Sequence, residues 1–198
     1  LRKQKSQRLS YVISNKKEHM THITLAVTGS ISAYKAADIT SQLTKLGIEV
    51  KVLMTPSAQK FITPLTLQVL SKNQVGLDVM MEDDPQRIEH INIGKETDLF
   101  LVAPASANTI AKLAMGLADN MVTSTALALP QRTKKLLAPA MNTKMLEHPA
   151  TQRNLKLLQD YGYQIIQPRD AVLACGDQGS GALATVDTII QAVKENCL

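Results

Sequence analysis

The chain has 198 residues, enough for one domain of ordinary size with a packed core. Hydrophobic residues make up 44% of it, which excludes a disordered chain, and with aromatics at 3% and no Trp the core must consist of aliphatic side chains and Met. The formal net charge of +5 comes from residues 1–19, since the remainder has sixteen basic and sixteen acidic side chains, a balance that argues against a basic nucleic-acid-binding surface.

Residues 1–19 are polar and lack apolar periodicity, and Met20 stands directly before the first strand-like run. We therefore expect 1–19 to be an N-terminal extension (a tag or upstream sequence, or else a flexible arm) and 20–198 to be the folded domain. No stretch approaches the ~20 apolar residues of a membrane span, and no signal-peptide run is present, so a cytoplasmic protein without a membrane partner is expected. In that reducing compartment Cys175 and Cys197 are not expected to form a disulfide.

Apolar runs and helical spacings alternate along the domain. Strands are predicted at 22–28, 48–54, 98–103, 135–138 and 163–167. Helices are predicted at 32–46, 64–71, 107–115, 119–129, 149–161 and 185–196, with a loop over the acidic segment 82–84. Because the strands are continuous apolar runs separated by helices, the sequence predicts a single three-layer α/β/α domain with a parallel sheet covered on both faces. Ligands bind at the carboxyl ends of such strands, so the residues that follow each strand are the candidate site.

The turn after the first strand, TGSIS, offers Gly29, Ser30 and free backbone amides at a helix start, which suits a phosphate. Neither the GxGxxG nor the Walker spacing is present, so a nucleotide bound here would be a mononucleotide. Thr55 and Ser57, after the second strand, add hydroxyls on the same edge. Helix N-capping explains these residues equally well, and that alternative stays open.

Two further strings follow the third and fourth strands. PASANT places Ser106, Ala107, Asn108 and Thr109 after a strand, where small side chains let the backbone approach a flat ligand and the polar groups can bond its ring heteroatoms. PAMNTKM places Asn142 where it can donate to a carboxylate, while its methionines pack against a flat ring or the core. A helix cap and a turn Asn are the alternatives.

His90 and Cys175 are the candidate acid/base groups. His90 lies beside a strand-like alternation, IEHINI, and a polar loop, which leaves both a structural and an acid/base role open. Cys175 lies in ACGDQGSGA, whose three glycines predict a mobile hairpin or flap that can close over a substrate and present a thiol. Cys197 is interpreted as incidental, and no metal site is expected.

These strings together resemble the homo-oligomeric flavin-containing cysteine decarboxylases, from about residue 20 to the end, and within them the phosphopantothenoylcysteine decarboxylase branch of coenzyme A synthesis. The resemblance implies a Rossmann-like, flavodoxin-related fold that binds FMN and a small-molecule substrate. It also implies a homo-oligomer, a trimer or a multiple such as a dodecamer, with active sites between subunits. One departure is visible, because the family's Met-Trp after the PAMN string reads Met145-Leu146 here.

The resemblance also implies individual roles. Gly29 and Ser30 would hold the FMN phosphate, with Thr55 on the same edge of the sheet, and the cofactor would be bordered by Ser106, Ala107, Asn108, Thr109 and Ala140. Asn142 would bind the substrate's carboxylate, with Met145 and Ala174 beside the substrate. His90 would be the acid/base and Cys175 the flap thiol.

The expected reaction is decarboxylation of 4′-phosphopantothenoylcysteine to 4′-phosphopantetheine. Oxidation of the substrate thiol by flavin gives a thioaldehyde, an electron sink that permits loss of carbon dioxide, and the resulting enethiol is then reduced. Three alternatives stay open: a peptidyl-cysteine decarboxylase of lantibiotic type, a non-catalytic regulatory flavoprotein, and a prenylated-flavin synthase. By resemblance, the Cys-Gly flap favours the coenzyme A branch over the peptidyl-cysteine decarboxylase, and the PAMN string and the Cys flap disfavour the prenylated-flavin synthase. The absence of a long acidic extension disfavours the regulatory protein.

Overall fold

The computed structural model describes residues 21–81, 86–174, 176 and 178–197. Its strands are β1 (His22–Val27), β2 (Glu49–Met54), β3 (Leu99–Ala105), β4 (Lys134–Pro139), β5 (Tyr163–Ile165), β6 (Arg169–Val172) and β7 (Gln178–Ala182). Its α-helices are α2 (Ala36–Lys45), α3 (Pro64–Ser71), α4 (Glu89–Glu96), α5 (Ala107–Met115), α6 (Met121–Leu127), α7 (Thr143–Glu147), α8 (Pro149–Asp160) and α9 (Val186–Cys197), and two short 3₁₀ helices are η1 (Ile31–Lys35) and η2 (Ala58–Lys60).

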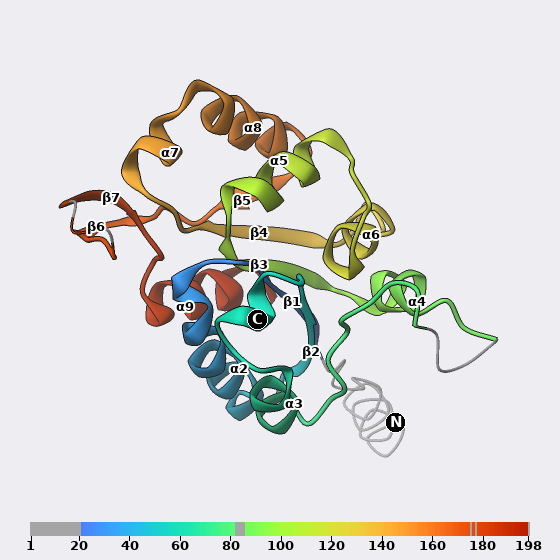
Figure 1. Ribbon diagram of the computed structural model, residues 1–198. Coiled ribbons are helices and arrows are strands. Elements are labelled where there is room, and N and C mark those ends of the chain that lie inside the picture. Colours follow the sequence, from blue (N-terminus) through green and yellow to red (C-terminus); the bar gives the residue numbers. More distant parts are fainter. Residues whose placement is uncertain (1–20, 82–85, 175, 177, 198) are drawn as a thin grey trace, which may run out of the picture.

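Five parallel strands form one sheet in the order β2-β1-β3-β4-β5. Helices α2, α3 and α9 lie on one side of this sheet, and α5, α6 and α8 lie on the other (Figure 1). The remaining two strands, β6 and β7, pair as an antiparallel hairpin beside the carboxyl ends of the sheet strands. The predicted three-layer α/β/α domain with a parallel sheet is confirmed.

The central strand β3 shows why a strand of this sheet has a continuous apolar sequence. All seven of its residues are buried. Leu99 and Leu101 pack into the cluster that contains α2 and α9, whereas Phe100 and Val102 pack into the cluster that contains α5 and α8. A strand covered on both faces has no polar side, so its hydrophobicity does not alternate.

Most predicted elements agree with the structure, and the differences have identifiable causes. The helices predicted at 64–71 and 107–115 match α3 and α5 at both ends. The first helix begins as the 3₁₀ turn η1, and the short helix α7 was missed. The alternation around His90 is not a strand but the start of α4, whose Gly94 packs so closely that a Cβ there would lie 3.0 Å from the Ala128 carbonyl oxygen. The close packing of α4 against the end of α6 favours a helix here, and the hydrophobic pattern of residues 88–93 does not reveal that packing.

The longest helices within the described ranges, α8 and α9, have 12 residues each. None of the helices that the structure describes has the length and apolar character needed to cross a bilayer. Over the same residues, no three His, Cys, Asp or Glu side chains gather as a metal site would require.

Candidate active site

The strand order creates a crevice at the carboxyl end of the sheet. After β1 the chain turns into η1 and α2 on one face, whereas after the neighbouring strand β3 it turns into α5 on the other face (Figure 1). Where two adjacent parallel strands send their connections to opposite faces, the loops diverge and leave room for a ligand. In sheets of this 2-1-3-4-5 order that switch point is a nucleotide-binding position.

A cavity of about 540 Å³ lies at this switch point. That volume is in the range of small-molecule and cofactor sites. Its walls come from the turns after β1, β3 and β4 and from the β6-β7 hairpin. The lining residues are Gly29, Ser30, Ile31, Ser32, Tyr34, Lys35, Phe61, Ser106, Ala107, Ala140, Met141, Asn142, Met145, Arg169, Val172, Leu173, Ala174, Gly181, Ala182 and Leu183.

The first turn is shaped by a close approach that only glycine permits. A Cβ on Gly29 would lie 2.5 Å from the Cβ of Ser57, in the turn after β2. Next to it, the Ser30 hydroxyl oxygen accepts a hydrogen bond from the Ser32 amide at 3.3 Å and so caps η1. The lack of a side chain at Gly29 therefore lets the turns after β1 and β2 lie close together. The capping interpretation of Ser30 is correct, whether or not a phosphate also binds there.

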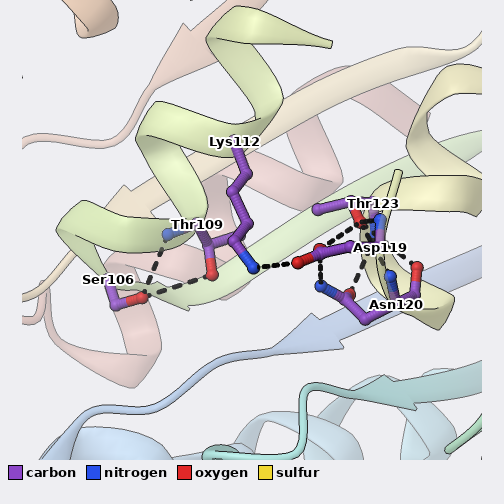
Figure 2. A network of polar contacts seen from close by, with 6 residues as sticks. All are labelled: Ser106, Thr109, Lys112, Asp119, Asn120 and Thr123. Carbon is purple, nitrogen blue, oxygen red and sulfur yellow. Dashed lines mark hydrogen bonds and ion pairs between the residues drawn. The ribbon is translucent and has the colours of Figure 1, made fainter. Parts of the chain in front are cut away.

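Two groups of polar contacts stabilise the helices that follow β3. Ser106 caps α5, because its hydroxyl oxygen accepts from the Thr109 amide at 3.3 Å. One turn further along α5, Lys112 reaches across to Asp119, directly before α6, and the Asp119–Asn120–Thr123 cluster caps that helix (Figure 2). This ammonium, through a hydrogen bond and its charge, lowers the pKa of the Asp119 carboxyl. The last turn of α5 is thus anchored to the residues that precede α6.

The turn after β4 carries the polar end of the cavity. Asn142 caps α7, with its side-chain oxygen accepting from the Lys144 amide at 2.9 Å. Met145 lines the cavity and is half exposed, whereas Leu146 points into the core and is only 8% exposed. The residue that replaces the family's Trp therefore packs in the core cluster of α5 and α8 and does not form the cavity wall.

The β6-β7 hairpin is attached to this same turn. The Met141 amide donates to the Gly181 carbonyl oxygen at 2.9 Å. Gly181 has φ +139°, and a Cβ there would lie 2.2 Å from the Met141 carbonyl oxygen, so this position requires glycine. The predicted hairpin is thus present and borders the cavity through Ala174, while its Cys175 lies outside the described residues.

The cavity is electropositive. Lys35 and Arg169 line it, and none of its described lining residues is acidic. The Arg169 side chain is oriented by a hydrogen bond from Nε to the Leu183 carbonyl oxygen at 3.2 Å. Two cations without a carboxylate favour anionic ligand groups such as phosphate and carboxylate. Neither residue was predicted from the sequence, although Lys35 stands in the first helical turn after Gly29 and Ser30.

The predicted site residues do not all come together in one chain. The cavity unites Gly29, Ser30, Ser106, Ala107, Ala140, Asn142, Met145 and Ala174. Thr55 is buried beside the same edge, where its hydroxyl accepts from the Ala58 amide at 3.3 Å. Asn108 is exposed on α5 and Thr109 is buried beneath its cap, and neither lines the cavity.

His90 is the residue that lies apart. It is the second residue of α4, which lies at the amino end of the sheet, opposite the cavity (Figure 1). Its side chain is partly buried, and the Nδ1 atom is fully covered without a hydrogen-bond partner among the described residues. Within one chain His90 cannot reach a ligand in the cavity.

Comparison with known proteins identifies the family. A family model described as Flavoprotein matches residues 12–198. The chain belongs to the Flavoprotein family. A probable phosphopantothenoylcysteine decarboxylase of Streptococcus mutans is 66% identical over 173 residues, which cover 87% of this chain and 97% of that protein. The coenzyme A biosynthesis bifunctional protein CoaBC of Bacillus subtilis is 43% identical over 88% of this chain, which spans 43% of CoaBC.

Solved structures of flavoproteins agree with this assignment. A cysteine-to-serine mutant of PPC decarboxylase, complexed with pantothenoylaminoethenethiol, superposes with a TM-score of 0.83 at 31% identity over 89% of this chain and 98% of its own. The FMN-dependent cysteine decarboxylase SpaF superposes with a TM-score of 0.74 at 28% identity over 87% and 97% of the two chains. The expected family, its flavodoxin-related fold and its FMN cofactor are confirmed.

Proposed function

We propose that this chain is an FMN-dependent decarboxylase that converts 4′-phosphopantothenoylcysteine to 4′-phosphopantetheine in coenzyme A biosynthesis. The observation that carries the proposal is the cavity at the β1/β3 switch point, which gathers Asn142, the two cations and the Cys175-bearing hairpin. It occurs in a chain that is 66% identical to a probable phosphopantothenoylcysteine decarboxylase over nearly that protein's whole length. A substrate with a phosphate at one end and a carboxylate at the other suits an electropositive cavity.

The residues present fit FMN. Gly29 lines the cavity with backbone alone, and Ser30 and Ser106 bring hydroxyl groups to the two sides of the switch point. Ala107 and Ala140 also line the cavity, and their small side chains suit the close approach of a flat ring. We infer that these residues hold the cofactor, with Thr55, Asn108 and Thr109 supporting or extending the same edge.

When bound, FMN supplies the two-electron oxidation of the substrate thiol and later returns the two electrons, so no net oxidation results. We infer that Asn142 holds the carboxylate of the cysteine unit, since its position beside Met145 and the hairpin is open to the cavity. The substrate then carries a thioaldehyde β to its carboxylate, which accepts the electron pair released with carbon dioxide. The resulting enethiol needs a proton at carbon, and we assign that donation to the Cys175 thiol.

One solved relative supports the role given to the thiol. The PPC decarboxylase structure complexed with pantothenoylaminoethenethiol is that of a cysteine-to-serine mutant. An enethiol retained where a cysteine is missing is what results when a thiol acts only after carbon dioxide has left. We therefore expect Cys175→Ser in this chain to accumulate the enethiol.

A second copy of the chain would complete the site. The cavity is bordered by apolar side chains that are half exposed or more, namely Ile31, Tyr34, Met145 and Val172, and such surface is costly to leave in water. His90 lies at the far end of the same sheet. We propose a homotrimer, or a multiple of it such as a dodecamer, in which α4 of one subunit carries His90 to the cavity of the next. The cytoplasmic setting, and a separate N-terminal extension over residues 1–19, stay predictions.

The substrate is tested by incubating the purified protein with 4′-phosphopantothenoylcysteine and following loss of carbon dioxide by mass spectrometry. A peptide that ends in cysteine serves as the competing substrate. Rapid turnover of the first and not the second is expected, and turnover of the peptide alone would contradict the proposal.

The composite site is tested by complementation. His90→Asn and Asn142→Asp should each be inactive, but their co-expression should restore activity to about a quarter of the parent value, since one interface in four then carries both intact residues. A mixture that stays inactive while size-exclusion chromatography shows mixed oligomers would contradict the sharing of sites.

A further inference from the structure

The hydroxyl of Thr28 links the two turns that form the switch point. Thr28 follows β1 directly and is fully buried. Its Oγ1 donates to the Pro104 carbonyl oxygen at 2.7 Å and accepts from the Ser106 amide at 2.9 Å. Both partners lie at the end of β3, more than seventy residues away in the chain, and Ser106 lines the cavity.

This link lies where the backbone pairing of the sheet has ended. The register between β1 and β3 runs from Ile23 with Leu99 to Ala26 with Val102, and in the described residues it goes no further. The pairing between β3 and β4 is also irregular after Val102. At the level of the cavity, the turn that begins at Gly29 and the turn that begins at Ser106 are therefore joined through the Thr28 side chain.

We propose that Thr28 is a positioning residue that sets the separation of the two cofactor-binding turns. The inference rests on the proposed role of these turns in holding FMN. Without the hydroxyl, the partly buried Ser106 amide and the buried Pro104 carbonyl lose this partner, and the turns relax to find water or another group. FMN binding must then bring both turns back into place, so the lost bonds weaken cofactor affinity and not only the stability of the fold.

The chain offers a matched control in β1, the strand that Thr28 follows. Thr24 is also buried, and its Oγ1 shares a hydrogen bond of 2.7 Å with Oγ1 of Thr97, just before β3. This bond likewise joins β1 to the β3 segment, but at the amino end of the sheet, away from the cavity. Thr24→Val therefore removes a buried hydroxyl of the same kind without touching the turns.

The test measures FMN dissociation from the purified holoprotein, by the rise of flavin fluorescence on dilution. Thr28→Val should raise the Kd for FMN about 10-fold, because one buried and one partly buried hydrogen bond are lost and each tenfold corresponds to about 1.4 kcal/mol. Thr28→Ser, which keeps the hydroxyl, and Thr24→Val should both stay near the parent Kd. Thermal unfolding of the FMN-free proteins reports the stability of each variant separately.

Two results would overturn the inference: FMN binding by Thr28→Val at the parent affinity, or an equal weakening by Thr24→Val, which would mean general destabilisation. If Thr28→Val does not fold, Thr28→Cys takes its place under the same criterion, because a thiol is only a weak donor and acceptor. A parent protein that releases no FMN on heating would instead refute the proposed cofactor site, which is a distinct outcome.

Discussion

The contact between Gly29 and Ser57 makes Gly29→Ala the most direct probe of the proposed cofactor site. The new Cβ would lie 2.5 Å from the Ser57 Cβ, whereas ordinary contact begins at 3.4 Å, so the two carbons must separate by roughly 0.9 Å. Neither carbon is the end of a flexible side chain. The separation therefore moves backbone, and the turn after β1 shifts away from the position that a bound phosphate needs.

The expected loss follows from the strain. Overpacking of this size typically costs about 1–3 kcal/mol. In the free protein the turn can move outward and relieve the strain, but FMN binding requires the turn in its original place, so the cost appears in the affinity. At 1.4 kcal/mol for each tenfold, the Kd for FMN should rise about 5-fold to 150-fold. Flavin fluorescence on dilution of the holoprotein measures it.

A double-mutant cycle checks that the clash is the cause. Ser57→Gly removes the atom that the new Cβ meets, so Gly29→Ala with Ser57→Gly should bind FMN nearly as tightly as Ser57→Gly alone. Gly47→Ala is the control for backbone strain, because Gly47 has φ +79° with nothing within 4 Å of a Cβ. It should lower stability without changing the Kd. A double variant that binds no better than Gly29→Ala would refute the reasoning.

Three further predictions concern other parts of the molecule. Because Lys112 lowers the pKa of the Asp119 carboxyl, the ion pair stabilises the fold at pH values above the ordinary Asp pKa of about 3.9. Asp119→Asn should therefore lower the free energy of unfolding by up to about 1 kcal/mol at pH 7. Urea denaturation should show this difference vanishing as the pH falls through the lowered pKa. Burial, with Asp98, raises the pKa of the Cys197 thiol to about 11. At pH 8 Cys197 should therefore hold about 90-fold less thiolate than an ordinary cysteine, and iodoacetamide labelling followed by peptide mass spectrometry should find its reaction slow. Leu146→Ala should lower the free energy of unfolding by about 2–5 kcal/mol and Met145→Ala by far less, since only Leu146 is buried; equal losses in urea denaturation would contradict that placement.

The local sequence was sufficient to predict most helices and strands and to predict where the strands end. The run LFLVA at 99–103 has no polar side chain on either face, which is a property of strands covered on both sides and can be predicted from the sequence. Gly47 and Pro64 mark helix boundaries by backbone chemistry alone. The PASANT and PAMN strings each follow a predicted strand. Because the carboxyl ends of parallel strands meet at one edge of a sheet, these strings and the cavity lie at the same edge.

Only the tertiary structure decided which of these ends face one another. The placement of β3 beside β1, rather than beside β2, comes from pairing between distant segments, and it is this order that creates the switch point and the Thr28 link. The same order puts Lys35 and Arg169 into one cavity and leaves His90 at the opposite end of the sheet. The pattern of polar and apolar side chains indicates which face of a helix or strand is buried. Strand order depends instead on contacts between segments far apart in the chain, and a short stretch of sequence does not contain that information.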